Sequence, residues 1–185
     1  VGFVLEETLG FCPHQLRGVQ LQRIIVVLAL LLNPRIIIAD EPVSMVDASL
    51  RANILETLRS LQKNYGVSIV YITHDLTTAF HIAKSIMVLY RGSVMEAGDV
   101  DHVIKNPQHP YTKALIAAVP EPDPANRLHE RPVVKGEPPS PSQAPTGCTF
   151  HPRCPAYMAG VCEVKGPTLV EIHPDHWVSC FLYES

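Results

Sequence analysis

Two short apolar runs, separated by a segment of helical length, constrain the fold of this chain more than any other feature. Ile36–Ala39 and Val67–Ile72 are rich in apolar and β-branched residues, as is typical of buried strands of a parallel sheet. Between them, Ala48–Tyr65 carries leucine and isoleucine at helical spacing, and Gly66 is a natural C-terminal stop. A strand–helix–strand order with a long crossover predicts an α/β fold with parallel strands.

The segments on either side extend this pattern. Apolar residues lie nearly all round Val19–Leu32, which predicts a largely buried helix. Ile86–Tyr90 and Ser93–Ala97 flank an Arg-Gly turn and predict a β-hairpin. Shorter helices are predicted at Leu76–Ala83, Val100–Lys105 and Tyr111–Ala118.

Composition divides the chain of 185 residues into three parts. Residues 1–119 carry the α/β pattern, residues 120–147 hold eight of the 17 prolines and predict an extended linker, and residues 148–185 form a cysteine-rich tail. The net charge of −3 argues against a general nucleic-acid binder. The apolar run Ile24–Leu32 is shorter than the roughly 20 residues that a membrane span needs. The chain begins at Val1 without a methionine, so we expect a fragment or a trimmed chain.

Acidic residues and a histidine directly follow the two predicted strands. Asp40 and Glu41 come after the first strand, and His74 and Asp75 come after the second. Because ligands bind at the carboxyl ends of parallel strands, we expect the two pairs to converge on one site. Asp40 suits Mg²⁺, which carboxylates hold together with substrate phosphates. Glu41 is then placed to activate a water, and His74 to donate a hydrogen bond to a terminal phosphate.

Each of these residues also has an ordinary interpretation. Taken singly, adjacent acids more often cap a helix, and a lone histidine more often lies at the surface or in a core. The order of the features favours the site, because an apolar strand, Asp-Glu-Pro, Ser-x-x-Asp, a helix, a second strand and Thr-His-Asp follow one another.

These motifs together resemble those of an ABC-transporter ATPase subunit. "IIIADEP" resembles the Walker B strand with its glutamate, "SMVD" the D-loop and "YITHD" the switch-histidine strand. The resemblance implies the C-terminal half of a P-loop (RecA-like) ABC ATPase domain. It also implies Asp40 as the Mg²⁺ ligand, Glu41 as catalytic base, Asp47 at a dimer interface and His74 as γ-phosphate sensor.

Two departures from the family pattern affect the expected ATP site. The chain contains no Gly-x-x-x-x-Gly-Lys-Ser/Thr loop, which supplies the phosphate cradle, so we expect the chain alone to be inactive. In "HQLRGVQLQR", the positions of the signature Leu-Ser-Gly-Gly-Gln are Leu16, Arg17, Gly18, Val19 and Gln20. Arg17 replaces the serine and Val19 the second glycine, which predicts a weakened composite site with the partner subunit. A decayed gene copy is the alternative.

The tail carries the cysteines Cys148, Cys154, Cys162 and Cys180. Four thiolates suit either an iron–sulfur cluster or tetrahedral zinc, whereas reduced cysteines in a small core are the plain alternative. Disulfides are the least favoured without a secretory signal. Residues 106–182, with "NPQHPYTKALIAAVP" and "GCTFHPRCPAY", resemble the C-terminal extension of oligopeptide and dipeptide importer ATPases. That resemblance implies a [4Fe–4S] cluster on the four cysteines, in preference to zinc.

The resemblance also implies a function and partners. It indicates an ATP-hydrolysing subunit of a prokaryotic peptide importer, peripheral at the cytoplasmic face of the membrane. The expected partners are a second ATPase subunit bound head to tail (as a homodimer or heterodimer), two membrane permeases and, indirectly, an extracytoplasmic substrate-binding protein. No nucleic-acid partner is expected. A non-catalytic remnant with a metal-binding tail and the ATPase of a nickel importer remain as alternatives.

Overall fold

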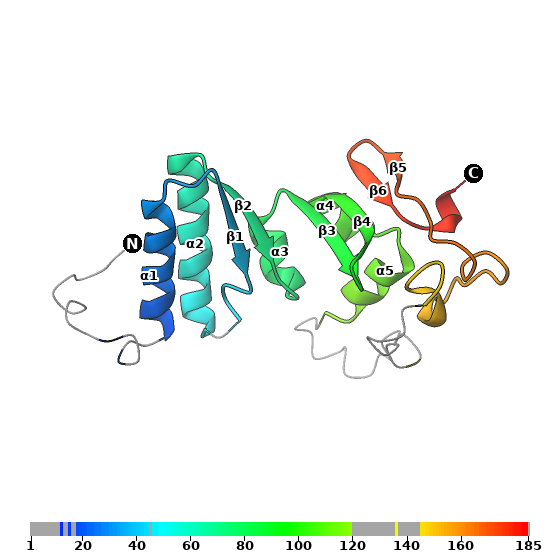
Figure 1. Cartoon of the computed structure of the whole chain (residues 1–185), viewed down its shortest axis with the longest axis horizontal. Helices are drawn as coiled ribbons and strands as arrows, with labels where there is room; N and C mark the ends of the chain where they lie inside the picture. Colours follow the sequence, from blue (N-terminus) through cyan, green and yellow to red (C-terminus); the bar gives the residue numbers. More distant parts are fainter. Residues whose placement is uncertain are drawn as a thin grey trace. The chain divides into compact units, whose positions relative to one another are not determined.

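The structure, a computed structural model, falls into two compact units, Val1–Ile82 and Ala83–Ser185 (Figure 1). It describes Cys12, Gln15 and residues 18–44, 46–119, 136 and 145–184. Most of the predicted linker, residues 120–147, therefore lies outside the described residues. Within the described part, no helix is both long enough and apolar enough to cross a membrane.

The described part of unit 1 contains two parallel strands and three helices. Its elements are α1 (Gly18–Leu31), β1 (Ile36–Asp40), α2 (Ala48–Tyr65), β2 (Ser68–Ile72) and α3 (Leu76–Ile82). The strands pair in parallel from Ile36 opposite Ser68 to Asp40 opposite Ile72, as the sequence predicts. Helix α2 ends at Gly66, whose left-handed φ of 66° lets its N–H donate to the carbonyl oxygen of Gln62.

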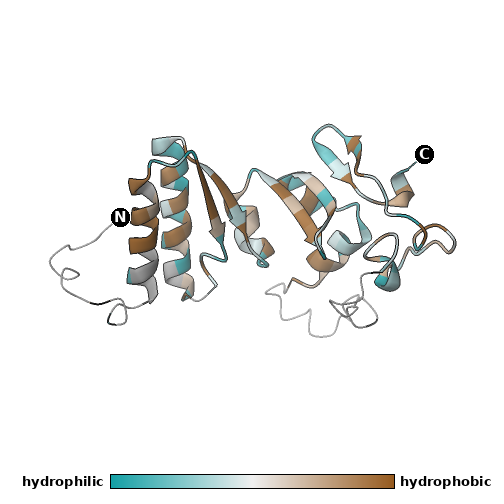
Figure 2. Cartoon of the chain, viewed as in Figure 1, coloured by the Kyte–Doolittle hydropathy of each residue, from teal (hydrophilic) through white to brown (hydrophobic). Residues whose placement is uncertain are grey.

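The core of unit 1 lies between the sheet and α2. Buried Val43 and the α2 residues Ile54, Leu58 and Leu61 pack against Ile37, Ile69 and Tyr71 of the strands. The opposite face of the sheet is exposed, with Ile38 at 69% and Val70 at 50%. The prediction that both strands are buried is therefore wrong for this face, because burial alternates along each strand and only one face meets α2. Figure 2 shows the apolar character of both strands.

The prediction that the first helix is largely buried is also wrong for one side of α1. Val26 packs against the unit 1 core. Ile25, Leu28 and Leu31 are more than half exposed. Apolar composition alone predicts burial all round, but a helix is covered only where a neighbouring element reaches it.

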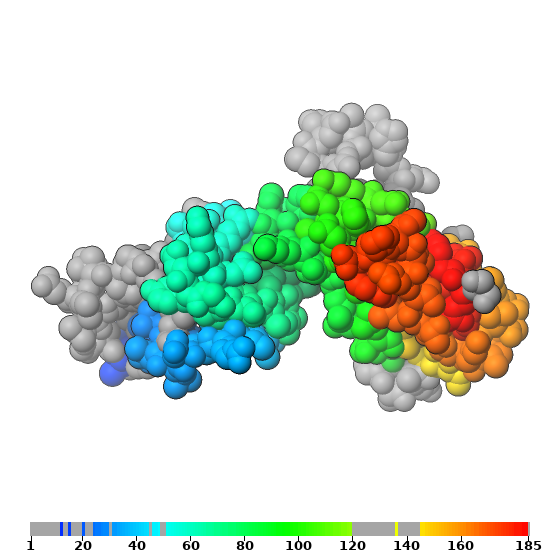
Figure 3. All heavy atoms as spheres, turned by 90° about the horizontal axis from the view of Figure 1, so that it is seen from above, coloured from blue at the N-terminus to red at the C-terminus, as the bar shows by residue number. Residues whose placement is uncertain are grey.

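Unit 2 is an antiparallel sheet flanked by short helices. Its elements are β3 (Ser85–Tyr90), β4 (Ser93–Asp99), α4 (Val100–Lys105), α5 (Pro110–Ala117), η4 (His151–Arg153), β5 (Val170–His173), β6 (His176–Val178) and η5 (Phe181–Tyr183). The strand order is β3-β4-β6-β5, so the predicted hairpin is present and two strands are added that the sequence did not reveal. Strand β6 pairs with β4, placing Gly98 opposite His176. Figure 3 shows the orange and red C-terminal residues lying against the green ones.

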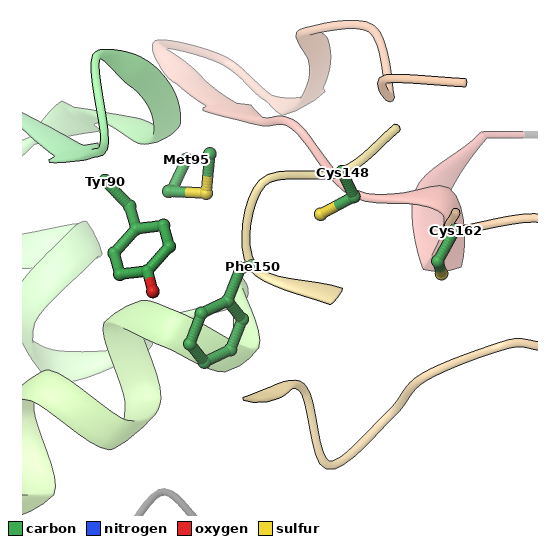
Figure 4. Packing of buried hydrophobic residues seen from close by; sticks show 5 residues of the cluster. All are labelled: Tyr90, Met95, Cys148, Phe150 and Cys162. Atoms are coloured by element: carbon green, nitrogen blue, oxygen red, sulfur yellow. The ribbon is translucent and has the colours of Figure 1, made fainter. Parts of the chain in front are cut away.

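The core of unit 2 joins the hairpin to the cysteine-rich segment. Tyr90, Met95, Cys148, Phe150 and Cys162 form one buried cluster (Figure 4). The rings of Tyr90 and Phe150 meet edge to face with centroids 5.3 Å apart, a favourable aromatic geometry. Two of the four tail cysteines are thus part of a hydrophobic core shared with β3 and β4.

Candidate active site at the strand ends

The structure brings Glu41 and His74 together at the carboxyl ends of β1 and β2. The N–H of Glu41 donates to the carbonyl oxygen of Ile72 at 2.9 Å, which continues the strand pairing by one residue. The backbone N–H of His74 donates to Glu41 Oε1 at 3.0 Å, and His74 Nδ1 lies 2.6 Å from the same oxygen. The convergence expected from the strand order is therefore present for this pair.

The contact with Glu41 determines which imidazole nitrogen of His74 is left for a ligand. A carboxylate only accepts hydrogen bonds, so Nδ1 carries a proton where it meets Glu41. Nε2 lies on the other side of a ring whose side chain is 82% exposed, whereas the Glu41 side chain is 34% exposed. The histidine can thus present Nε2 to solvent or to a bound group while the glutamate holds its orientation.

Glu41 adopts an unusual backbone conformation that directs its carboxylate toward β2. Its φ of 45° lies in the left-handed region, which costs a residue with a side chain about 1–2 kcal/mol. The turn is held by hydrogen bonds on both sides. The backbone N–H and hydroxyl of Ser44 donate to the Glu41 carbonyl at 3.2 and 3.0 Å, and Glu41 itself donates to Ile72. Such strained residues concentrate at functional sites.

Asp40 and Asp47 flank this pair along the chain. Asp40 is the last residue of β1 and is exposed opposite Ile72. Asp47 is the residue before α2, and its side chain makes no capping hydrogen bond to the helix in the described structure. Both carboxylates are therefore exposed near the strand ends, as a metal ligand and an interface residue would need to be.

The predicted signature residues are only partly described. Leu16 and Arg17 lie outside the described residues, and Gly18, Val19 and Gln20 form the first residues of α1. The first N–H groups of a helix have no partner within the helix.

Sequence reasoning missed an ion pair beside the site. Arg51 Nη1 of α2 lies 3.1 Å from Asp75 Oδ2, and Asp75 directly follows His74. The available signal was weak, since an arginine on an amphipathic helix usually lies in solvent.

The four tail cysteines share one region but do not form a metal site in the described geometry. The N–H of Cys148 donates to the carbonyl oxygen of Cys162 at 2.8 Å. Burial, together with the neighbouring Cys180, Cys148 and Cys162, raises the pKa of the Cys154 thiol to about 11. Cys148 and Cys162 belong to one buried cluster, and Cys154 packs against it. Among the described residues, however, no group of three or more such donors is arranged to hold a metal, so the predicted cluster is not supported by this geometry.

Comparison with known proteins shows which proteins this chain is similar to. Residues 95–162 match the family model "Oligopeptide/dipeptide transporter, C-terminal region". The chain is 42% identical to the oligopeptide transport ATP-binding protein AppF of Bacillus subtilis, covering 94% of this chain and 53% of that protein. This chain matches the C-terminal part of the ATP-binding subunits of oligopeptide and dipeptide ABC transporters. The resemblance given by the sequence motifs is therefore confirmed.

Other relatives agree on the extent of the match. The Bacillus subtilis protein YkfD is 44% identical, covering 94% of this chain and 53% of YkfD. The oligopeptide transport ATP-binding protein OppF of Salmonella typhimurium is 42% identical, covering 91% of this chain and 50% of OppF. The chain thus spans about half the length of the curated relatives it matches. A solved dimeric ATP-binding cassette, MJ0796 bound to ADP and Pi, is 33% identical over 51% of this chain and 40% of that chain, with a TM-score of 0.47.

Proposed function

We propose that this chain belongs to an ATP-hydrolysing subunit that energises uptake of oligopeptides or dipeptides across the cytoplasmic membrane. The observation that carries the proposal is the contact between Glu41 and His74 at the ends of adjacent strands, where Glu41 Oε1 lies 2.6 Å from His74 Nδ1. The match to oligopeptide and dipeptide transport proteins supports the substrate class. The subunit acts at the cytoplasmic face, bound to two membrane permeases and served by an extracytoplasmic substrate-binding protein.

The residues at the strand ends have separate tasks in ATP hydrolysis. Asp40 supplies a hard carboxylate oxygen, the donor that Mg²⁺ prefers, and the ion when bound neutralises phosphate charge. Glu41 binds His74 through Oε1, which leaves Oε2 to orient a water and take up its proton. His74, oriented by its Nδ1 contact with Glu41, presents Nε2 to the γ-phosphate. An N–H at Nε2 would donate a hydrogen bond there and stabilise the charge that develops.

A second ATPase subunit, bound head to tail, completes the proposed site. Asp47, with its exposed carboxylate, faces this partner. Gly18, Val19 and Gln20 at the start of α1 approach the partner's ATP with helix N–H groups. Val19 adds a branched side chain where glycine would let the backbone come closer, so the composite site that this helix completes is the weaker one.

The proposal is tested with Glu41→Gln in the full-length protein assembled with its partner subunit. The amide keeps the size and one oxygen of the carboxylate but cannot take a proton from water. We expect ATP hydrolysis to fall at least ~100-fold, as for loss of a general base, while ATP binding is retained.

Glu56→Gln is the matched control, because Glu56 is an exposed carboxylate on α2, 70% exposed at its side chain. Unchanged turnover in Glu41→Gln, or an equal loss in the control, would refute the catalytic assignment.

A non-catalytic protein with a metal-binding tail is the second candidate. The packing of Cys148, Cys154 and Cys162 in and against one buried cluster favours it. We propose a [4Fe–4S] cluster in preference to zinc on Cys148, Cys154, Cys162 and Cys180. Ligation requires thiolates, so the thiols must move from the described packing and lose their protons. Visible absorbance with four iron atoms per chain after anaerobic purification supports the cluster, and a colourless protein with zinc excludes it.

A further inference from the structure

Arg51 connects two parts of the candidate site that are far apart in the sequence. Its guanidinium Nη1 lies 3.1 Å from Asp75 Oδ2. Its own backbone N–H donates to the carbonyl oxygen of Asp47 at 2.9 Å, in the first turn of α2. Asp75 in turn is bonded through the chain to His74. Arg51 thus contacts Asp47, the residue before α2, through its backbone, and the turn that carries His74 through its side chain.

The turn that carries Asp75 leaves one carboxylate oxygen for Arg51. Asp75 Oδ1 accepts hydrogen bonds from the N–H groups of Thr77 at 2.9 Å and Thr78 at 3.4 Å, which caps α3. The N–H of Asp75 donates to Thr73 Oγ1 at 3.0 Å. The cap therefore uses Oδ1 alone, while Oδ2 meets Arg51. Helix α3 does not need the arginine in order to be capped.

The surroundings of Arg51 differ from those of a solvated surface arginine. Its side chain is 38% exposed and that of Asp75 is 30% exposed, so the pair is partly removed from water. Arg51 Nε is buried and has no hydrogen-bond partner among the described residues, although buried guanidinium donors are normally paired. Leaving that donor unpaired is costly, which indicates that the position of the guanidinium is set by Asp75 and not by solvation.

We propose that Arg51 is a positioning residue for His74. By fixing Asp75, it fixes the backbone N–H of His74 that donates to Glu41 Oε1 at 3.0 Å, and hence the orientation of the imidazole. Because Asp47 directly precedes α2, the same residue links the turn that we propose to face the partner to the histidine. This inference deepens the proposed function and depends on it for its catalytic consequence, since a small displacement of a catalytic group lowers turnover.

The test measures ATP turnover and the His74 amide in the full-length protein with its partner subunit. Arg51→Ala should lower kcat on the order of 10-fold with KM for ATP changed less than about twofold, and should speed hydrogen exchange at the His74 amide. Arg51→Lys should retain more of kcat than Arg51→Ala. In the native contact a single nitrogen of Arg51 meets Asp75, and the lysine ammonium can supply one such donor. Asp75→Asn keeps the hydrogen-bonding cap of α3 but weakens the ion pair with Arg51. The loss of kcat in the double variant Arg51→Ala/Asp75→Asn should therefore be no larger than the loss in Arg51→Ala alone.

Arg59→Ala is the matched control. Arg59 lies on the same helix and contacts the carbonyl oxygen of His81 at the far end of α3. It should leave kcat and the His74 amide unchanged. Any of three results would overturn the inference. They are an unchanged kcat in Arg51→Ala, additive losses of kcat in the double variant, and a loss of kcat in Arg59→Ala as large as that in Arg51→Ala. If turnover is unchanged in Glu41→Gln, the proposed function fails, and unchanged hydrogen exchange at the His74 amide in Arg51→Ala overturns the positioning role independently of that result.

Discussion

Replacing Glu96 by leucine should strongly destabilise unit 2. Glu96 lies on β4 and has no exposed surface. Its Oε1 accepts from the N–H of Gln108 at 2.9 Å and lies 2.7 Å from His176 Nε2 of β6. Its Oε2 accepts from the N–H of His109 at 2.9 Å, at the start of α5. One carboxylate thus joins two strands and a helix.

The magnitude follows from the three partners that the leucine would leave behind. A buried donor without an acceptor costs about 1–3 kcal/mol. Leucine would leave three such groups without their acceptor, namely the N–H groups of Gln108 and His109 and Nε2 of His176. His176 is only 2% exposed and cannot turn to water. At the low end of that range for each group, we expect a loss of roughly 3 kcal/mol, a large part of the ~5–15 kcal/mol that stabilises a typical domain.

Urea unfolding followed by tryptophan fluorescence measures this loss. Trp177 is the single tryptophan of the sequence, and it lies on β6 opposite Ala97, next to the network. Glu171→Leu is the matched control, because Glu171 is an exposed glutamate on β5 of the same sheet. A loss below about 1 kcal/mol for Glu96→Leu, or one no larger than for Glu171→Leu, would show that the buried network does not hold the sheet together.

Two further predictions concern unit 2. Burial lowers the pKa of His109 to about 4, against the opposing influence of Glu96, so the folded state binds fewer protons than the unfolded state between about pH 6.5 and pH 4. The free energy of unfolding should therefore fall by up to roughly 3 kcal/mol as the pH drops through this window. Urea unfolding at pH 7.5 and pH 4.5 measures the loss. The loss should be smaller in His109→Asn, because asparagine does not titrate in this range and still caps α5. Gly147→Ala should destabilise unit 2 more than Gly160→Ala in the same assay. Both glycines have positive φ, but only at Gly147 would the added Cβ overlap a carbonyl oxygen, that of Cys162, and equal losses would contradict this.

Local sequence signals predicted those elements whose start and stop chemistry is strong. The bounds of α2 agree with Ala48–Tyr65, since regular apolar spacing ends at a glycine that can adopt the left-handed conformation. The contact of Glu41 with His74 was also predictable in outline, because adjacent parallel strands end at one edge of the sheet. The roles of these residues in hydrolysis stay predictions.

Features that depend on distant partners could not be predicted in the same way. Strands β5 and β6 are short, and β6 is held by pairing with β4 and by the buried contact of His176 with Glu96. Their local pattern carries no sign of that partner. Arg51 was missed for a related reason, since its contact with Asp75 is made across 24 residues of sequence. The exposed face of β1 shows the opposite kind of error. Its apolar composition predicted burial on both faces, but no described element packs against this one.

The contacts that hold Glu41 and His74 in place do not involve the residues that we propose to complete the partner's ATP site. Glu41 and His74 are fixed by the pairing of β1 with β2 and by the bonds to Ile72 and Ser44, all within unit 1. None of these contacts involves the altered signature at the start of α1. Under the proposed function, substitutions at Arg17 or Val19 should act on completion of the partner's site, and substitutions at Glu41 should act on the chemical step. Arg51 lies between the two, because it joins helix α2, which Asp47 directly precedes, to the turn that carries His74.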